Sequence, residues 1–414
     1  SKKYHVLVLD IGTEFVKCLI VRVDDRDHGT VIGFGRQRQK YSDMVAGAVT
    51  DIPGVIKNCE EAIQKAYDQA GIFPKQVIAG IAGELVKGAT TTVTHTRKQP
   101  RQKITEAELR DMIAQVQAQA LEESRKDLAW ETGHSAIDVK LVNSAIVNVR
   151  IDGYRITNPI GFQGTHVDVS IYNSFAPIVH LGAIQTIIES LELHLLQVAA
   201  EPYAVSRCLG TEASTDLSGI FIDIGGGTTD IAVVRSGGLE GTKMFALGGR
   251  VFTKRIADEL KVSFQEAEKL KLEYTAEKLD GNAKDKIAAI VARDIEVWLS
   301  GVELTLEEFS QGKRFEDNKL LPPQIYLCGG GSKLPEIQEA LKTKGWAKEL
   351  PFSRHPDIDA LHPNKIVTLT DETKKLTDEA AVTPMALGNL GIELTGAESV
   401  LDSVMEKVMA SLTV

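Results

Sequence analysis

Two segments of the chain, 213 positions apart, carry nearly the same motif, Val6–Thr13 and Gly219–Asp230. In each, an apolar run ends in Asp-Ile-Gly, small hydroxylated residues follow, and a second apolar run leads away, which predicts strand, tight turn, strand. Glycine lets the turn backbone approach a ligand, while threonine and aspartate add hydroxyl and carboxylate groups. Two such hairpins facing each other are suited to hold the phosphates and metal ion of a nucleotide. The candidate residues are Asp10, Gly12 and Thr13 in the first copy and Asp223, Gly225, Gly226, Gly227, Thr228 and Thr229 in the second.

The two copies differ in how specific they are. An aspartate before a glycine turn is common, so the first copy alone fits a plain turn equally well. The second copy has three glycines, two threonines and flanking carboxylates, Asp223 and Asp230. This composition leaves little side chain for packing and much polarity for a ligand.

Three further segments have positions in the chain that would place them at a cleft between two halves. Glu201-Pro202 lies at the crossing between the halves, where a carboxylate can orient water or a hydrated cation; a simple helix start is the alternative. The turn Gly329–Ser332 joins a strand to a helix, which lets backbone approach a nucleotide or anion. Glu268 and Lys271 are one helical turn apart and can reach a ribose or base together, with an exposed ion pair as the alternative.

The elements that position these residues follow from periodicity and breakers. In the first half we expect a helix over Val55–Ala70, a strand over Gln76–Ala82 and a helix over Gly182–Leu193. In the second half, helical patterns dominate residues 250–312, and a strand over Gln324–Cys328 precedes a helix over Pro335–Lys344.

Residues 87–178 form an inserted unit of one helix and a few strands. Thr94–Lys103 is basic and polar and contains Pro100, which predicts a surface linker. Thr105 and Glu108 have the spacing of a capping box, so a long helix begins there. Strands follow over residues 145–151 and 165–172.

Composition limits the class of protein. With 414 residues, 43% hydrophobic and 25% charged, the chain is an ordinary globular protein of two or three domains. A net charge of -10 argues against nucleic acid as a partner. The four cysteines have no zinc spacing, which favours buried thiols in a reduced, cytoplasmic compartment. No apolar run approaches the ~20 residues of a membrane-spanning helix.

Taken in order, these segments resemble the actin-like ATPase superfamily, which implies an α/β fold: two duplicated βαβ-type halves around a nucleotide cleft, with an inserted small α+β subdomain, 1C. By this resemblance, Asp10–Lys17 is the phosphate 1 segment and Asp223–Asp230 is the phosphate 2 segment. Glu201-Pro202 is connect 1 and Pro384–Gly391 is connect 2. The adenosine segment is Gly329, Gly330, Gly331 and Ser332. The implied division is a first half (1–86, 179–213 and 383–396), subdomain 1C (87–178), a second half (214–250 and 322–382), helical subdomain 2B (251–321) and a C-terminal amphipathic helix (397–414).

The resemblance also implies ATP and Mg²⁺ as cofactors. Asp10 and Asp223 would hold Mg²⁺ mainly through water, and Lys17 belongs to the phosphate 1 segment. Amides of the two glycine turns would offset the phosphate charge, and Glu201 would help to place the attacking water. Thr13, Thr228 and Thr229 would add hydroxyl contacts.

The position of the insertion distinguishes members of the superfamily. Val147–Tyr154, Asn158–Gly164 and Val167–Val169 resemble subdomain 1C of the FtsA family of bacterial division proteins. This implies an ATP-binding scaffold with slow or no turnover that assembles head to tail into filaments. It also implies binding of an FtsZ-like C-terminal peptide on subdomain 2B and a link to the inner face of the cell membrane through the C-terminal helix.

Three alternatives stay open beside it. Phe15 departs from the usual FtsA pattern, and Val16-Lys17 is more similar to PilM, a pilus-assembly adaptor that binds a short peptide of a membrane partner. A small-molecule kinase would need a catalytic aspartate, for which Asp230 is the only obvious spare carboxylate in the phosphate turns. A chaperone would need a further β-domain after the last motif. The tail has a helical apolar stripe from residue 400 to 412 but few basic residues, so it is either a packed helix or protein contact, or a membrane anchor.

Overall fold

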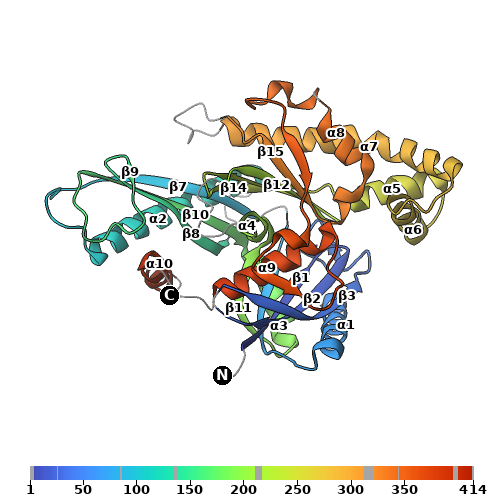
Figure 1. Ribbon diagram of the computed structural model, residues 1–414, viewed down its shortest axis with the longest axis horizontal. Coiled ribbons are helices and arrows are strands. Elements are labelled where there is room, and N and C mark those ends of the chain that lie inside the picture. Colours follow the sequence, from blue (N-terminus) through green and yellow to red (C-terminus); the bar gives the residue numbers. More distant parts are fainter. Residues whose placement is uncertain are drawn as a thin grey trace.

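The structure is a computed structural model, and two twisted sheets with helices packed against them make up its body (Figure 1). It describes residues 4–25, 27–83, 86–133, 138–209, 217–311, 320–343, 345–394 and 400–412. The predicted boundary at residue 213 and the start of the tail at residue 397 lie outside these residues.

In the described residues, the first half contains a six-stranded sheet in the order β11-β6-β1-β2-β3-β17. Its strands are β1 Tyr4–Ile11, β2 Phe15–Val23, β3 Gly29–Arg38, β6 Gln76–Ile81, β11 His194–Ala200 and β17 Leu369–Asp371, with β4 Met44–Val45 and β5 Ala48–Val49 as a separate pair. The strand β17 pairs with β3 in this sheet although the predicted division assigns its residues to the second half. The predicted first hairpin is confirmed, since β1 and β2 pair antiparallel with Asp10 opposite Lys17.

Four helices cover the two faces of this sheet: α1 Ile52–Ala70, α3 Ile178–Ser190, α4 Glu201–Arg207 and α9 Val382–Glu393. The helices α1 and α3 pack together on one face, while α4 and α9 pack together on the other. The helix α1 starts three residues before the predicted boundary because the Asp51 side chain caps it, accepting from the Gly54 amide. The helix α3 starts four residues earlier than predicted, directly after Pro177 at the end of a strand.

The second half is built on a longer sheet, with nine strands among the described residues in the order β16-β15-β12-β13-β14-β7-β10-β8-β9. The strands from this half are β12 Gly219–Ile224, β13 Thr229–Arg235, β14 Gly238–Phe245, β15 Gln324–Cys328 and β16 Asp357–Ala360. The second predicted hairpin is confirmed as β12 and β13, with Asp223 opposite Asp230.

Helices dominate residues 249–311, as predicted, and further short helices follow β15. They are α5 Gly249–Leu260, α6 Phe264–Thr275, α7 Gly281–Gln311, α8 Pro335–Lys342 and the 3₁₀ helices η1 Gly330–Lys333, η2 Trp346–Glu349, η3 Pro363–Lys365 and η4 Glu379–Ala381. Their apolar faces share one core with the inner face of β12 and β13, which includes the fully buried Trp298.

The inserted unit is joined to the sheet of the second half. Its elements are β7 Lys87–Thr96, α2 Glu106–Thr132, β8 Val139–Ile151, β9 Tyr154–Arg155 and β10 His166–Pro177. The strand β7 pairs antiparallel with β14, and the Tyr172 hydroxyl of β10 lies 2.9 Å from the Thr242 hydroxyl of β14. Tyr172 also stacks on Tyr203 of α4, so the unit contacts both halves.

The prediction of a surface linker over Thr94–Lys103 is wrong for its first residues. Thr94 to Thr96 lie in β7 and pair with β10. The cause is the run of β-branched residues from Thr90 to Thr94, which favours a pleated strand more strongly than its polarity favours a loop.

The helices α2 and α10 Val400–Leu412 pack against each other on the inserted unit. The α2 helix begins as predicted, with Thr105 accepting from the Glu108 amide. The α10 side chains of Val404, Met405 and Val408 are buried in a core shared with α2 and the neighbouring sheet. The described part of the tail is therefore a packed helix, one of the two predicted alternatives.

The four cysteines are free and buried, as predicted, and burial raises the pKa of the Cys208 thiol to about 12. Such thiols behave as small apolar side chains. In the part of the chain that the structure describes, no helix combines the length and the hydropathy needed to cross a bilayer.

Candidate nucleotide-binding site

The turns of the two hairpins are closed by the same hydrogen bond. The Gly12 amide donates to the Phe15 carbonyl at 3.1 Å, and the Gly225 amide donates to the Thr228 carbonyl at 2.9 Å. Within the described chain, no acceptor is found for the central amides of either turn, those of Thr13, Glu14, Gly226 and Gly227. Successive unpaired amides in a turn form a concavity that suits an anion.

The two turns meet face to face across the halves. A Cβ atom at Gly227 would lie 2.7 Å from the Thr13 hydroxyl oxygen, which already accepts from the Gly47 amide at 3.0 Å. Only glycine permits this approach, so the second turn is fitted closely to the first. The duplicated motifs of the sequence therefore form one site.

Arg250, at the start of α5, crosses from the second half to the first turn. Its guanidinium donates to the Glu14 carboxylate at 2.8 Å and to the Thr13 and Met44 carbonyls at 2.6 and 2.9 Å. The side chains of Arg250 and Glu14 are only 10% and 14% exposed. This contact holds the two halves together beside the paired turns.

Behind the turns, four carboxylates are buried near one another: Asp10, Glu201, Asp223 and Asp230. Lys17 binds Asp10 at 3.0 Å, the Thr383 hydroxyl of α9 donates to Asp223, and the Thr228 hydroxyl donates to Asp230 at 3.0 Å. The first Glu201 oxygen, Oε1, is buried without a hydrogen-bond partner among the described residues. If all four acids were ionised, Lys17 alone could not balance their charge.

Burial and mutual repulsion raise the pKa of three of these acids. Burial is the larger cause for Glu201, whose pKa lies well above its usual range, with Asp10, Asp230 and Asp223 adding to it. Burial raises the pKa of Asp223 despite Thr383 and Lys17, and burial and Asp223 together raise the pKa of Asp230 to about 8. A bound cation would reverse these shifts, because it favours the ionised form.

These shifts predict a stability that falls as pH rises. Asp230 binds a proton in the folded chain up to pH about 8 but releases it near its ordinary value when unfolded, so the stabilisation is lost as pH rises toward 8. Without nucleotide, we expect the thermal midpoint to fall between pH 5 and pH 8.5, and Asp230→Asn to reduce that fall by at least about 3 °C, roughly 1 kcal/mol. Scanning calorimetry at both pH values measures this. The exposed Asp68→Asn is the control, and an equal fall in all three proteins would contradict the assignment.

The predicted adenosine turn lies against Asp223. Gly329 has φ +82°, and a Cβ there would lie 2.2 Å from Asp223 Oδ1 and 2.5 Å from the Ile224 carbonyl oxygen. The Ser332 hydroxyl is buried and donates to the Gly329 carbonyl at 2.7 Å. The serine therefore stabilises the turn, and its hydroxyl hydrogen is already used within the turn.

Because of this close approach, Gly329→Ala has a large expected effect. The methyl group requires both a strained backbone and a displaced Asp223, so we expect a loss of about 3 kcal/mol or more. Urea unfolding measures it, with Gly345→Ala as the control, since its Cβ meets no atom within 4 Å. Equal stability of the two variants would show that the turn can shift freely.

The predicted pair Glu268 and Lys271 is buried, which excludes the alternative of an exposed ion pair. Lys271 Nζ lies 2.8 Å from Glu268, 2.9 Å from the Gly249 carbonyl and 2.7 Å from the Thr253 hydroxyl. Although burial opposes ionisation, Lys271, Thr253 and Arg38 hold the pKa of Glu268 below its ordinary value. All three ammonium hydrogens have partners, so a ribose contact from Lys271 would have to replace one of them.

Thr229 does not face the cleft, contrary to the expectation of a hydroxyl contact. It is fully buried, donating to the Leu247 carbonyl at 2.7 Å and accepting from the Trp298 indole at 3.0 Å. Neighbouring strand residues point to opposite faces, so only one of Thr228 and Thr229 can face the acids, and it is Thr228. Thr229 packs the helices onto β13.

The sequence comparisons point to one family. Residues 220–369 match the model of the cell division protein FtsA. The chain is 28% identical over 274 residues to FtsA of Neisseria meningitidis, which covers 66% of this chain and 62% of that protein. It is 25% identical over 351 residues to FtsA of Streptococcus pneumoniae, covering 80% and 71%. The chain is similar in sequence to FtsA proteins.

The solved structures show the fold of this FtsA-like chain. It is similar to the PilM-PilN type IV pilus biogenesis complex, with a TM-score of 0.64, 16% identity, and 94% of this chain and 99% of that chain covered. It is also similar to the ethanolamine utilization protein EutJ of Carboxydothermus hydrogenoformans, with a TM-score of 0.51, 17% identity and coverage of 94% and 90%. The fold is that of the actin-like ATPases, as the sequence predicted.

The acids of the FtsA-like chain fit a hydrated magnesium ion. No three or more acidic, histidine or cysteine side chains of the described residues are arranged to hold a metal directly. Mg²⁺ commonly keeps several waters and uses one or two carboxylates, so Asp10 and Asp223 fit it as water-mediated ligands. When bound, it would offset the charge of phosphate oxygens.

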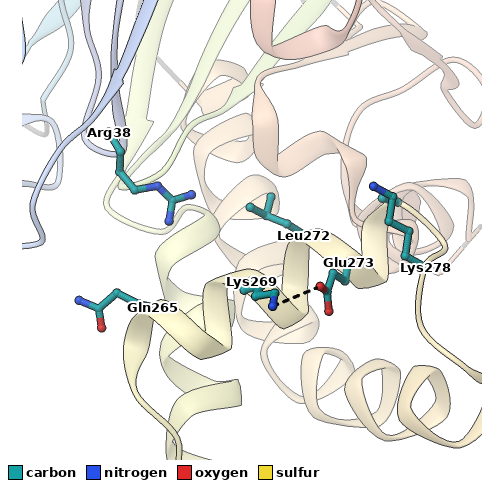
Figure 2. Close-up of a pocket in the computed structure, with 7 residues that line it drawn as sticks. Arg38, Gln265, Lys269, Leu272, Glu273 and Lys278 are labelled. Atoms are coloured by element: carbon teal, nitrogen blue, oxygen red, sulfur yellow. Dashed lines mark ion pairs between the residues drawn. The ribbon is translucent and has the colours of Figure 1, made fainter. Parts of the chain in front are cut away.

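Several site residues of the FtsA-like chain were missed by sequence reasoning. They are Glu14, Arg36, Arg38, Arg250 and Thr383. Arg36 and Arg38 are two residues apart at the end of β3, and this spacing is the sequence signal that could have placed them on one face of a strand. Arg38 reaches toward α6 across a cavity of about 220 Å³ that is also lined by Gln265, Lys269, Leu272, Glu273, Ala276 and Lys278 (Figure 2).

Proposed function

We propose that the chain is an ATP-binding scaffold of the actin-like fold, which assembles head to tail and acts in cell division as FtsA-like proteins do. The observation that carries this proposal is the meeting of the two Asp-Ile-Gly turns over buried acids, where Gly227 leaves room for Thr13. The turn amides, which have no acceptor among the described residues, would bind the phosphates, and the buried carboxylates would hold a hydrated Mg²⁺. Glu201 is the residue proposed to place the attacking water, because its Oε1 has no hydrogen-bond partner among the described residues and the charges of the other three acids act on this carboxyl.

Nucleotide binding would bias assembly by stiffening the cleft between the halves. The proposed subunit contact is the inserted unit, because large apolar side chains lie exposed on it: Trp130 of α2 is 89% exposed and Tyr154 of β9 is 77% exposed. Exposed aromatic side chains are typical anchors of protein interfaces.

This contact predicts a specific loss of assembly. The double variant Trp130→Ser and Tyr154→Ser should fold and bind Mg-ATP as the wild type does, because both side chains lie in water. Its critical concentration for sedimentation with Mg-ATP should rise at least about tenfold, the effect of losing roughly 1.4 kcal/mol. Val367→Ser, at another exposed site, serves as the control. Unchanged sedimentation of the double variant would rule out these residues as a contact.

The proposed partner is an FtsZ-like C-terminal peptide on the helical subdomain, residues 251–321. The α7 helix there exposes Val297 by 58% and Leu304 by 61%, one above the other at a spacing of seven residues. Apolar side chains at this spacing form one stripe, which suits a short peptide.

Membrane attachment through α10 would require the helix to leave α2. Its buried side chains Val404, Met405 and Val408 would lose about 1.5–3 kcal/mol each when exposed. Lys407 would also lose its ion pair with Glu106, 2.7 Å long. We therefore propose a packed α10 as the resting state, with attachment at the inner face of the cell membrane only after release.

The second candidate function is a PilM-like adaptor that binds a short peptide of a membrane partner. The seating of α10 on the inserted unit favours it, because that surface demonstrably accepts an apolar helix. Peptide titration separates the two functions. An FtsZ-type peptide that binds and is lost on Leu304→Ser supports the scaffold, whereas a peptide that competes with α10 supports the adaptor.

A further inference from the structure

Two arginines of β3 face the cleft from the first half. Arg36 lies opposite Lys17, and Arg38 lies opposite Phe15, in the β2–β3 register. Directly opposed residues of an antiparallel pair share a face of the sheet. The guanidinium carbons of Arg36 and Arg38 lie 3.5 and 4.9 Å from the centre of the Phe15 ring. The Phe15 ring therefore contacts the guanidinium groups of Arg36 and Arg38, and Lys17 is a third cation on the same face of the sheet.

Among the described residues, neither arginine has a carboxylate within hydrogen-bond length. Within the described chain, no carboxylate lies within 4 Å of the Arg36 guanidinium. The carboxylates nearest to Arg38 are Glu14 at 3.6 Å and Glu268 at 3.8 Å, both beyond hydrogen-bond length. Only Lys17 has a close partner, Asp10 at 3.0 Å.

Repulsion between the neighbouring cations favours the binding of an anion beside them. Burial, together with Arg38, lowers the pKa of Arg36 although Asp378, Glu14 and Glu268 attract it. A guanidinium stacked on a ring keeps its N–H edge free, and its planar fork matches the oxygens of a phosphate. The geometry therefore suits a phosphate-bearing ligand better than an isolated halide or a metal.

The position of Arg36 and Arg38 indicates which phosphate groups they would bind. Phe15 ends the turn whose Thr13 and Glu14 amides are unpaired, so the arginines stand directly beside the predicted phosphate turn. On the opposite side, Lys269 and Lys278 line the cavity that Arg38 enters from β3 (Figure 2). The positive group thus extends from the turn to the mouth of the cleft.

We propose that Arg36 and Arg38 bind the phosphate chain of the nucleotide from the first half, with the Phe15 ring as the positioning residue that keeps both guanidinium groups aimed at it. The proposal rests on the proposed nucleotide-binding function and adds two ligand contacts that the predicted motifs do not contain. Hydrogen bonds to charged groups contribute roughly 1.5–3 kcal/mol each, so losing both should weaken binding at least tenfold.

The test is isothermal titration of the full chain with Mg-ATP, adenosine and inorganic tripolyphosphate. For the double variant Arg36→Gln and Arg38→Gln, Mg-ATP and tripolyphosphate should bind at least about tenfold more weakly, while adenosine affinity stays within about twofold. Binding of Mg-ATP by the double variant should also depend less on salt concentration, since fewer charge contacts remain. The variant should melt no lower than the wild type, because like-charge repulsion is removed.

Arg354→Gln is the matched control, because this arginine is 57% exposed and its carboxylate partner among the described residues is Asp357, outside the cleft. Wild-type affinity of the double variant for both phosphate ligands would overturn the proposal. If the wild type binds no ATP, the proposed function fails, and tripolyphosphate alone decides this inference: arginine-dependent binding supports it, and no binding overturns it.

Discussion

The Asp223→Ala variant should bind no Mg-ATP measurable by isothermal titration. Asp223 lies between the two halves of the site: it accepts from Thr383, its charge acts on Lys17, and Gly329 is packed against its Oδ1. Removing the carboxylate removes one of the two proposed water-mediated magnesium ligands and leaves the phosphate charge uncompensated.

The fold should survive this substitution. Burial and the neighbouring Asp10 raise the pKa of Asp223, so ionising this carboxyl in the folded chain has an electrostatic cost that alanine removes. We expect a thermal midpoint equal to or above that of the wild type. Asp359→Ala, at an exposed position on the edge strand β16 of the same sheet, is the control and should bind Mg-ATP normally. Normal Mg-ATP affinity in Asp223→Ala would show that this carboxylate does not hold the metal.

The second large effect is expected for Arg250→Ala, which removes the contact between the halves. The buried guanidinium binds the Glu14 carboxylate and three carbonyls of the first half, and its loss leaves Glu14 without its closest partner. Breaking such a pair should cost about 2–4 kcal/mol, after allowance for partial exposure. The halves should also separate, giving a larger radius of gyration in small-angle scattering and weaker Mg-ATP binding.

The same helix offers a matched control for Arg250. Arg255 of α5 makes two hydrogen bonds to Asp294 at 3.0 and 2.7 Å, but its side chain is 41% exposed and it contacts only the second half. Arg255→Ala should cost no more than about 1 kcal/mol and leave the scattering unchanged. Equal stability and equal scattering of the two variants would mean that other contacts hold the halves together.

The parts of the fold that local pattern determines could be predicted from the sequence. Both hairpins follow from apolar runs that stop at Asp-Ile-Gly, and the start of α2 follows from the Thr105 cap. The free, buried state of the four cysteines agrees with their scattered positions, which lack the spacing of a zinc site.

What could not be predicted depends on tertiary contact. The pairing of Gly241 with Ala89, which joins the inserted unit to the second sheet, has no local signature because both strands look like ordinary edge strands. Likewise, the apolar stripe of α10 has the same sequence pattern whether the helix packs on protein or on lipid. In the structure, Met405 of this stripe is buried against protein. In the sequence, Arg250 resembles any charged residue in the first turn of a helix. Its contact with the first hairpin turn can be recognised only in the folded structure.

The measurement that tests the central claim most directly is negative-stain electron microscopy with parallel sedimentation, with and without Mg-ATP. The account predicts head-to-tail filaments that sediment with Mg-ATP, are absent without nucleotide, and fail to form in Asp223→Ala. A wild-type protein that binds Mg-ATP but stays monomeric at all accessible concentrations would contradict the scaffold and leave the peptide-binding adaptor as the better account.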